Sequence, residues 1–368
     1  MLSYRGIGIR VHSIKSSAGS SHLDSTNLTR NLAKSFINQK VMRGYLRLCL
    51  ATLVALSHTD YSNTINIGFP AVIVFYMLAG YVVTHLLHKH FPPKHLSKFY
   101  IDRILRIFPL YLFFLLPVAL FLYLTNFRDA KFTPFSIFAN LTIIPLNYFM
   151  YLKVHVIPAY SVLPPAWSLG LELQAYAILP LIIRSLPAKW IVGFVSLFIF
   201  SISAFRIIDE GFWGYTLIPG VIYVFLTGSA ICRNMKFRDN ADSFDRRFPT
   251  ICWSWLLLLL ISLYLSHNLH AISTATILGF LIGMPIVQYT SSSSLRLPFD
   301  SIMGQISYGV FLIHMPVAWM FEFLIKRSPV GMSDFTVIMI ISIIVSAGCA
   351  LPIDHFMWPL RKSFTKVQ

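Results

Sequence analysis

Ten apolar stretches, most of them long enough to cross a lipid bilayer, account for the larger part of this chain of 368 residues. A transmembrane helix needs about 20 predominantly apolar residues and satisfies all its backbone hydrogen bonds internally. Only 12% of the residues are charged, against about 25% in a soluble domain. The sequence therefore predicts an all-α, polytopic membrane protein with about ten transmembrane helices: Val41–Ser57, Ile67–Leu87, Ile104–Leu124, Ala166–Leu186, Trp190–Ile208, Phe212–Cys232, Ile251–Ser266, Leu269–Tyr289, Ile302–Ile325 and Phe335–Trp358.

The distribution of positive charge predicts the orientation of these helices. The formal net charge is +16. With both termini in the cytoplasm, 24 of the 30 lysines and arginines fall in cytoplasmic segments or at their edges. This is the positive-inside bias of membrane proteins. The basic excess therefore reports topology, and we expect a multi-pass protein of the cell (inner) membrane that contacts the lipid bilayer and no nucleic acid.

Three segments follow from this pattern. Residues 1–40 are polar, Ser-rich and basic, and are predicted to form a flexible cytoplasmic tail. Residues 41–360 form the membrane domain, and residues 361–368 a short cytoplasmic tail. The longest outside connection, Thr125–Pro165, contains five prolines and is large enough to act as a lid. Within it, Phe135–Leu146 is too short to span and is predicted to be interfacial or re-entrant.

The stretch LRLCLATLVALSHTD, Leu46–Asp60, places an arginine and a histidine in an apolar segment. Arg47 and His58 are eleven residues apart, so on a helix they lie on one stripe, roughly 16 Å apart along the axis. Ionisable residues within a spanning helix are costly and usually face a cavity. The pair therefore predicts a polar path along this helix.

In the segment YIDRILRIFPLY, Arg103 and Arg106 are three residues apart and share a helix face. Two guanidinium groups on one face can bind phosphates through their planar sets of donors. The alternative interpretation is a pair of interfacial anchors that obey the positive-inside rule, and spacing alone favours the anchors.

Ser168, Glu172 and Tyr176 recur every four residues in WSLGLELQAY and form one polar stripe. Glu172 is predicted to lie roughly 10 Å below the outer surface, at the depth of His58. A carboxylate there needs a partner or a proton. It serves either to join helices by hydrogen bonds or to take part in chemistry.

A second polar stripe occurs in GQISYGVFLIHMP, where Ser307 and His314 are seven residues apart and share a face. A single buried histidine is more often a packing residue than a catalyst, so we expect His314 to support the structure. The histidine-rich run His85–His95 lacks carboxylate or cysteine partners and does not predict a metal site.

A further motif, VFYMLAGYVV, lies at Val74–Val83. Taken in order, these motifs resemble the acyltransferase-3 family of integral membrane O-acyltransferases, which modify surface polysaccharides. The resemblance spans Arg47–Pro316. Ala79 stands where a serine is common before Gly-Tyr, and Gly170 and Leu173 replace residues that are often polar in the Trp-Ser-Leu motif. The motifs that carry the resemblance are Arg47-x10-His58, VFYMLAGYVV (Val74–Val83), Arg-x-x-Arg in DRILRIFPLY, WSLGLELQAY and SYGVFLIHMP.

The resemblance implies an acyl-CoA donor, most often acetyl-CoA, as co-substrate, and no bound cofactor or metal. It implies a hydroxyl of a glycan at the outer face as acceptor: lipopolysaccharide O-antigen, capsule or exopolysaccharide. It also implies that His58 is catalytic and that Arg103 and Arg106 bind the donor. From its place on the stripe with His58, Arg47 is predicted to line the path of the acyl-CoA arm. Supporting positions within the matched motifs are Trp167, Ser168, Tyr176, Ser307, Tyr308 and His314.

Two questions about His58 stay open at the level of sequence. Imidazole can take the proton of the acceptor hydroxyl as a general base, or carry the acyl group briefly as acyl-imidazole. Either Glu172 or Asp60 can orient the ring, as a carboxylate does in a hydrolytic triad. Glu172 has the better depth and Asp60 the shorter path, which favours Glu172 slightly. The rival functions are a carrier or flippase for a glycan or lipid-linked sugar, and a structural subunit of an export complex.

Overall fold

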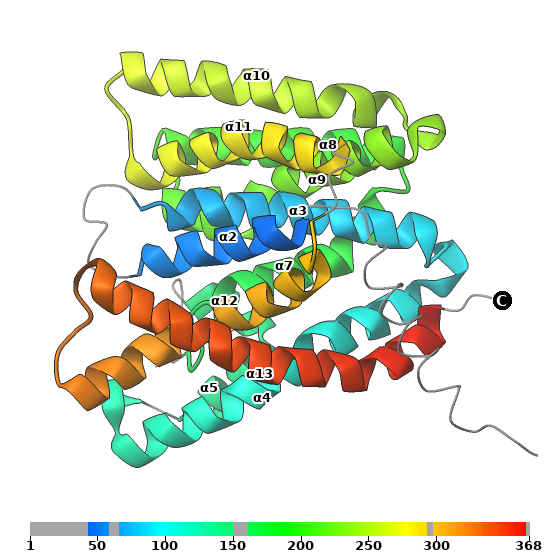
Figure 1. Cartoon of the computed structure of the whole chain (residues 1–368). Helices are drawn as coiled ribbons and strands as arrows, with labels where there is room; N and C mark the ends of the chain where they lie inside the picture. The colour runs from blue at the N-terminus through cyan, green and yellow to red at the C-terminus, as the bar shows by residue number, and fades with distance from the viewer. Residues whose placement is uncertain (1–42, 59–65, 131, 150–160, 293–296, 366–368) are drawn as a thin grey trace, which may run out of the picture. The chain divides into compact units, whose positions relative to one another are not determined.

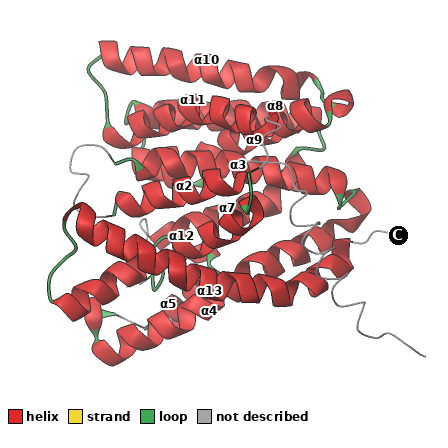
Figure 2. Cartoon of the chain, viewed as in Figure 1, coloured by secondary structure: helices red, strands yellow, loops and turns green. Residues whose placement is uncertain are grey.

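The computed structural model describes residues 43–58, 66–130, 132–149, 161–292 and 297–365 (Figure 1). Within these ranges the regular structure is helical and includes no β-strand (Figure 2). The predicted tail at residues 1–40 and the candidate Asp60 lie outside the described residues. The α-helices are α2 (Arg43–Leu56), α3 (Gly68–Lys89), α4 (Leu96–Thr125), α5 (Pro134–Thr142), α7 (Ala166–Ile182), α8 (Leu186–Ala204), α9 (Ile218–Lys236), α10 (Ser243–Leu265), α11 (Ala271–Ser292), α12 (Asp300–Ile325) and α13 (Gly331–Thr365).

Eight helices of the described chain are long and apolar enough to cross a membrane. They are α3, α4, α8, α9 with the π-helical turn Phe212–Thr216 before it, α10, α11, α12 and α13. The other two predicted spans correspond to α2, with 14 described residues, and α7, with 17. The chain is therefore a multi-helical membrane protein, and the count of about ten spans and the sidedness of the termini stay predictions.

Several helices extend beyond the apolar runs that predict them. Helix α4 starts at Leu96, so Arg103 and Arg106 lie within it and not at its entry. Helix α10 starts at Ser243, where the Asp242 side chain accepts from the backbone N–H of Asp245 and the Asp245 side chain accepts from that of Asp242. Helix α13 continues to Thr365, so the predicted start of a tail at residue 361 falls inside a helix. Hydropathy marks the apolar part of a helix, whereas caps and polar turns set its ends.

Helices α3 and α9 are the most deeply buried spans. In an apolar stretch of 18 residues, 72% of the residues are buried within the protein for α3, and 83% for α9 with the π-helical turn before it. Helix α3 packs against α9, α11, α2 and α7 (Figure 1). A helix that is apolar on every side fits such an internal position, and α3 thereby brings α2 and α7 together around one space.

Glycines allow α3 and α9 to approach closely. A Cβ atom added at Gly80 of α3 would lie 2.0 Å from the carbonyl oxygen of Phe225, and one added at Gly228 of α9 would lie 1.9 Å from that of Met77. Small residues at helix contacts let backbones meet in membrane proteins, where van der Waals packing replaces the hydrophobic drive.

We expect Gly228→Ala to destabilise the protein by about 1–3 kcal/mol, because the added methyl group forces the two backbones apart. The check is the melting temperature of the detergent-solubilised protein. Gly348→Ala in α13 is the matched control, since nothing lies within 4 Å of its added Cβ. A Gly228→Ala protein that melts like the wild type would show that α3 and α9 do not need this close contact.

Candidate active site

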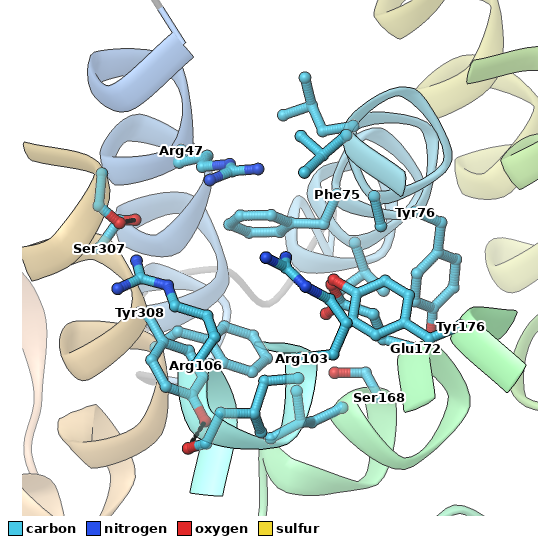
Figure 3. A pocket seen from close by; sticks show the side chains of 18 residues that line it. Arg47, Phe75, Tyr76, Arg103, Arg106, Ser168, Glu172, Tyr176, Ser307 and Tyr308 are labelled. Carbon is cyan, nitrogen blue, oxygen red and sulfur yellow. Dashed lines mark hydrogen bonds between the residues drawn. The ribbon is translucent and has the colours of Figure 1, made fainter. Parts of the chain in front are cut away.

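A cavity of about 140 Å³ lies among α2, α3, α4, α7 and α12 (Figure 3). We call it the arginine cavity. In Figure 3 the guanidinium groups of Arg47 and Arg103 extend toward its middle, and Arg106 lies beside Ser307 and Tyr308. A concentration of polar groups this high is unusual between apolar helices and marks a functional space. The polar residues that line it are Arg47, Tyr76, Arg103, Arg106, Ser168, Glu172, Tyr176, Ser307 and Tyr308.

Arg103 and Arg106 each have a carboxylate partner. Arg103 forms an ion pair with its neighbour Asp102, which is 2% exposed. Nη1 of Arg106 lies 2.6 Å from Oδ1 of Asp354 in α13. Buried charges are stable only when they are paired and hydrogen-bonded, so these aspartates keep the two guanidinium groups in place inside the membrane domain.

The same two aspartates are joined by Arg361 of α13. Its Nε lies 3.1 Å from Oδ1 of Asp102, and its Nη1 lies 3.2 Å from Oδ1 of Asp354. Gln305 of α12 donates to the other oxygen of Asp354 over 2.7 Å. This network ties α4, α12 and α13 together beside the arginine cavity. Sequence spacing did not predict a role for Asp102, Gln305, Asp354 or Arg361. An aspartate and an arginine seven residues apart in an apolar helix, such as Asp354 and Arg361, are nevertheless a usable signal.

Arg47 differs from the other two arginines of the cavity. Within the described part of the chain, no carboxylate lies in ion-pair distance of Arg47. Glu172 lines the same cavity but accepts a hydrogen bond from the hydroxyl of Tyr176. Arg47 is therefore the cavity arginine whose donors are most available to an anionic ligand.

Three hydroxyl groups of the cavity donate hydrogen bonds to backbone carbonyls. Ser168 donates to the carbonyl of Pro165 over 3.1 Å, Ser307 to that of Gly304 over 3.0 Å, and Tyr308 to that of Ile107 over 3.0 Å. The Tyr308 bond joins α12 to α4, whereas the two serine bonds are local, and all three leave the hydroxyl oxygens as acceptors. Trp167, by contrast, lines neither cavity of this section and packs with its ring 5.4 Å from that of Tyr215.

A second cavity, of about 200 Å³, is lined by the two histidines of the predicted motifs. We call it the histidine cavity. His58 lies in the turn after α2, and His314 projects from α12; their rings are stacked with centroids 5.4 Å apart and planes 20° apart. The other residues lining this cavity are Ala55, Arg128, Met315, Ala318, Trp319, Glu322, Ser328, Pro329 and Ile338.

The two cavities lie along the same pair of helices. Helix α2 carries Arg47 and leads into His58, and α12 carries Ser307 and then His314. Seven residues of helix correspond to roughly 10 Å along the axis. Phe311 of α12 lines the arginine cavity, and its ring centroid is 6.4 Å from that of His314 and 5.8 Å from that of Phe75.

This arrangement differs from the predicted one in two respects. Helix α2 ends at Leu56, so His58 does not continue the helical stripe of Arg47, and the two line different cavities. Glu172 lies in the arginine cavity, while the ring stacked on His58 is that of His314. The prediction rested on the similar depth of Glu172 and His58 in two separate helices. Equal depth does not determine which side chains are lateral neighbours.

A family model described as an acyltransferase domain matches residues 44–351 of this chain. The chain belongs to the acyltransferase-3 family. An uncharacterized protein of Aquifex aeolicus (strain VF5) is 32% identical to this acyltransferase-3 member over 196 residues, which are 52% of this chain and 84% of that protein. No solved structure matched the chain.

The acyltransferase match includes every residue that lines the two cavities. It ends before Asp354 and Arg361, the α13 side chains that complete the network around Arg106. Chemically, the arginine cavity suits a phosphate-bearing ligand, and the histidine cavity supplies imidazole nitrogens for proton transfer. The two sets of groups are thus separated in space but joined by α2 and α12.

Proposed function

We propose that this membrane acyltransferase moves an acyl group, with acetyl favoured, from acyl-CoA to a hydroxyl of a surface glycan such as lipopolysaccharide O-antigen, capsule or exopolysaccharide. The donor enters from the cytoplasm, and the acceptor binds at the outer face of the inner membrane. One observation carries the proposal: three arginines converge in one cavity, and two histidines line a second cavity along the same two helices.

The arginine cavity supports donor binding. Acyl-CoA carries phosphates at one end and the reactive thioester at the other end of a long, narrow arm. Around the cavity, four arginines, Arg47, Arg103, Arg106 and Arg361, face three carboxylates, those of Asp102, Glu172 and Asp354. This positive excess favours an anion, and guanidinium groups bind phosphate oxygens in pairs.

The histidine cavity supports the transfer step. His58 takes the proton of the acceptor hydroxyl while the hydroxyl oxygen attacks the thioester carbonyl carbon, forming the new C–O bond. The C–S bond then breaks, and the proton passes from the imidazolium to the departing CoA thiolate. The products are the acylated glycan and free CoA, with no net gain or loss of protons.

The test uses membranes that contain the protein, acetyl-CoA labelled in the acetyl group, and surface polysaccharide from which ester groups have been removed by mild alkali. We expect label to enter the polysaccharide as alkali-labile ester. Membranes without the protein are the control. A polysaccharide that gains no more label than in the control would favour the carrier interpretation. In that interpretation the protein moves a glycan or lipid-linked sugar across the membrane and forms no ester bond.

Glu172→Gln tests whether this side chain belongs to the donor cavity or to the chemistry of His58. An amide oxygen still accepts the hydrogen bond of Tyr176, while a negative charge near the donor phosphates is removed. In the wild type this charge would repel the donor phosphates and weaken donor binding. We therefore expect Glu172→Gln to lower the KM for acetyl-CoA severalfold and to keep kcat within about threefold of wild type.

The opposite pattern would restore the predicted pairing of Glu172 with His58. In that case kcat would fall by about 100-fold or more with an unchanged KM, as for loss of a triad carboxylate. Steady-state kinetics at varied acetyl-CoA concentration separate the two patterns. Asp239→Asn, at an exposed position beyond α9, is the matched control.

A further inference from the structure

The side chain of His314 is buried, and within the described ranges only one of its two ring nitrogens has a hydrogen-bond partner. It is 2% exposed. Its Nδ1 lies 3.2 Å from the carbonyl oxygen of Val310, one turn earlier in α12. A carbonyl oxygen can only accept, so Nδ1 carries the hydrogen and the neutral ring has a bare lone pair at Nε2.

That lone pair has no hydrogen-bond partner among the described residues. Buried polar atoms in native proteins are nearly always hydrogen-bonded, so an exception needs an explanation. A packing role for His314 would be served better by an apolar side chain of the same size. The residue lines the histidine cavity, so a group that enters this cavity can supply the missing partner.

The rest of the cavity indicates the chemistry of that group. Nη2 of Arg128 lies 2.5 Å from Oε2 of Glu322, so this ion pair balances its own charge. The Arg128 guanidinium also lies over the ring of Trp319, 5.6 Å from its centroid. An aromatic ring, a self-balanced ion pair and a bare imidazole nitrogen suit a neutral ligand rich in hydroxyl groups, as a sugar is.

We propose that His314 binds the acceptor: its Nε2 accepts a hydrogen bond from a hydroxyl of the sugar that enters the histidine cavity. This inference rests on the proposed function. His58 and His314 then have different tasks, since His58 removes the proton of the reacting hydroxyl and His314 holds the sugar in place. The backbone bond to Val310 keeps the lone pair of His314 available, because it fixes the tautomer.

Two substitutions separate this role from packing. In His314→Asn the amide can keep the contact with the Val310 carbonyl, but no atom takes the place of Nε2. In His314→Gln the longer side chain places an amide oxygen near the Nε2 position, where it can accept the same hydrogen bond. His267→Asn is the matched control, at an exposed turn with φ of 52° that asparagine tolerates.

The probe is polysaccharide freed of ester groups by mild alkali, at varied concentration, with labelled acetyl-CoA. We expect His314→Asn to lower kcat/KM for the polysaccharide about tenfold, the effect of losing one neutral hydrogen bond. His314→Gln should recover most of that loss. The KM for acetyl-CoA and the melting temperature in detergent should change little in either variant.

Equal activity of the two variants would overturn the proposal. If both variants transfer like the wild type, His314 is a packing residue, and if both are inactive, His314 acts as a base. A fall in donor affinity or melting temperature that matches the fall in transfer would also overturn it. An inactive wild type would instead remove the proposed function, and this inference with it. The two failures are therefore distinguished by the wild-type rate.

Discussion

Replacing His58 with alanine is expected to lower the rate of acyl transfer by about 100-fold to 10,000-fold, the range that a positioned general base supplies. Although His58 is partly exposed, desolvation by the surrounding protein lowers its pKa below the ordinary histidine value, which favours the neutral ring that a base needs. The imidazole also lines the cavity that we assign to the acceptor. The measurement is the initial rate of label transfer at saturating acetyl-CoA.

The His58→Ala result is informative only if the protein is present and folded. His355→Ala, at an exposed position of α13, is the matched control, and both variants should reach wild-type abundance in the membrane. The KM for acetyl-CoA should stay close to wild type, because the arginines that we propose bind the donor lie in the other cavity. Transfer above about a tenth of the wild-type rate would exclude His58 as the base.

Arg47→Ala is expected to raise the KM for acetyl-CoA by about tenfold to 100-fold, with a smaller change in kcat. A hydrogen bond to a charged group contributes about 1.5–3 kcal/mol, and no carboxylate among the described residues competes for Arg47. Arg47→Lys should recover only part of the loss, because an ammonium group cannot make the paired contact of a guanidinium.

Arg247→Ala, at an exposed position of α10, controls for the loss of a positive charge elsewhere. Competition by free CoA provides a second measurement, since weaker phosphate binding should reduce inhibition in parallel with the rise in KM. If Arg47→Ala leaves both constants unchanged while Arg106→Ala changes them, the donor phosphates bind on the side of α4 and not at Arg47.

The sequence was sufficient to place the helices but not their lateral neighbours. Apolar runs predicted all of the long spans, because burial in lipid requires such runs. The starts of α4 and α10 were missed, because their first turns are polar and hydropathy does not detect them. The ends of helices depend on capping groups, which contribute little to a hydropathy average.

For the candidate site, spacing identified residues that share a helix face, and eight of the predicted polar residues line one cavity. Spacing did not reveal the partners that come from other helices. Asp354 and Arg361 approach Arg106 and Asp102 only because α13 packs against α4. The stacking of His58 on His314 likewise requires the contact of α2 with α12. A contact between helices so far apart in the chain leaves no local pattern in a single sequence.

The separation of the two cavities along α12 has a consequence for substrate selection. A donor held by its phosphates at the arginines meets the histidines only if its arm extends past Phe311 over the further distance of roughly 10 Å. Helix α12 would then act as a molecular ruler that measures the arm and not the acyl group at its tip. Thioesters with a shortened arm would be anchored without reacting, and thioesters that lack the nucleotide would reach the histidines without being anchored.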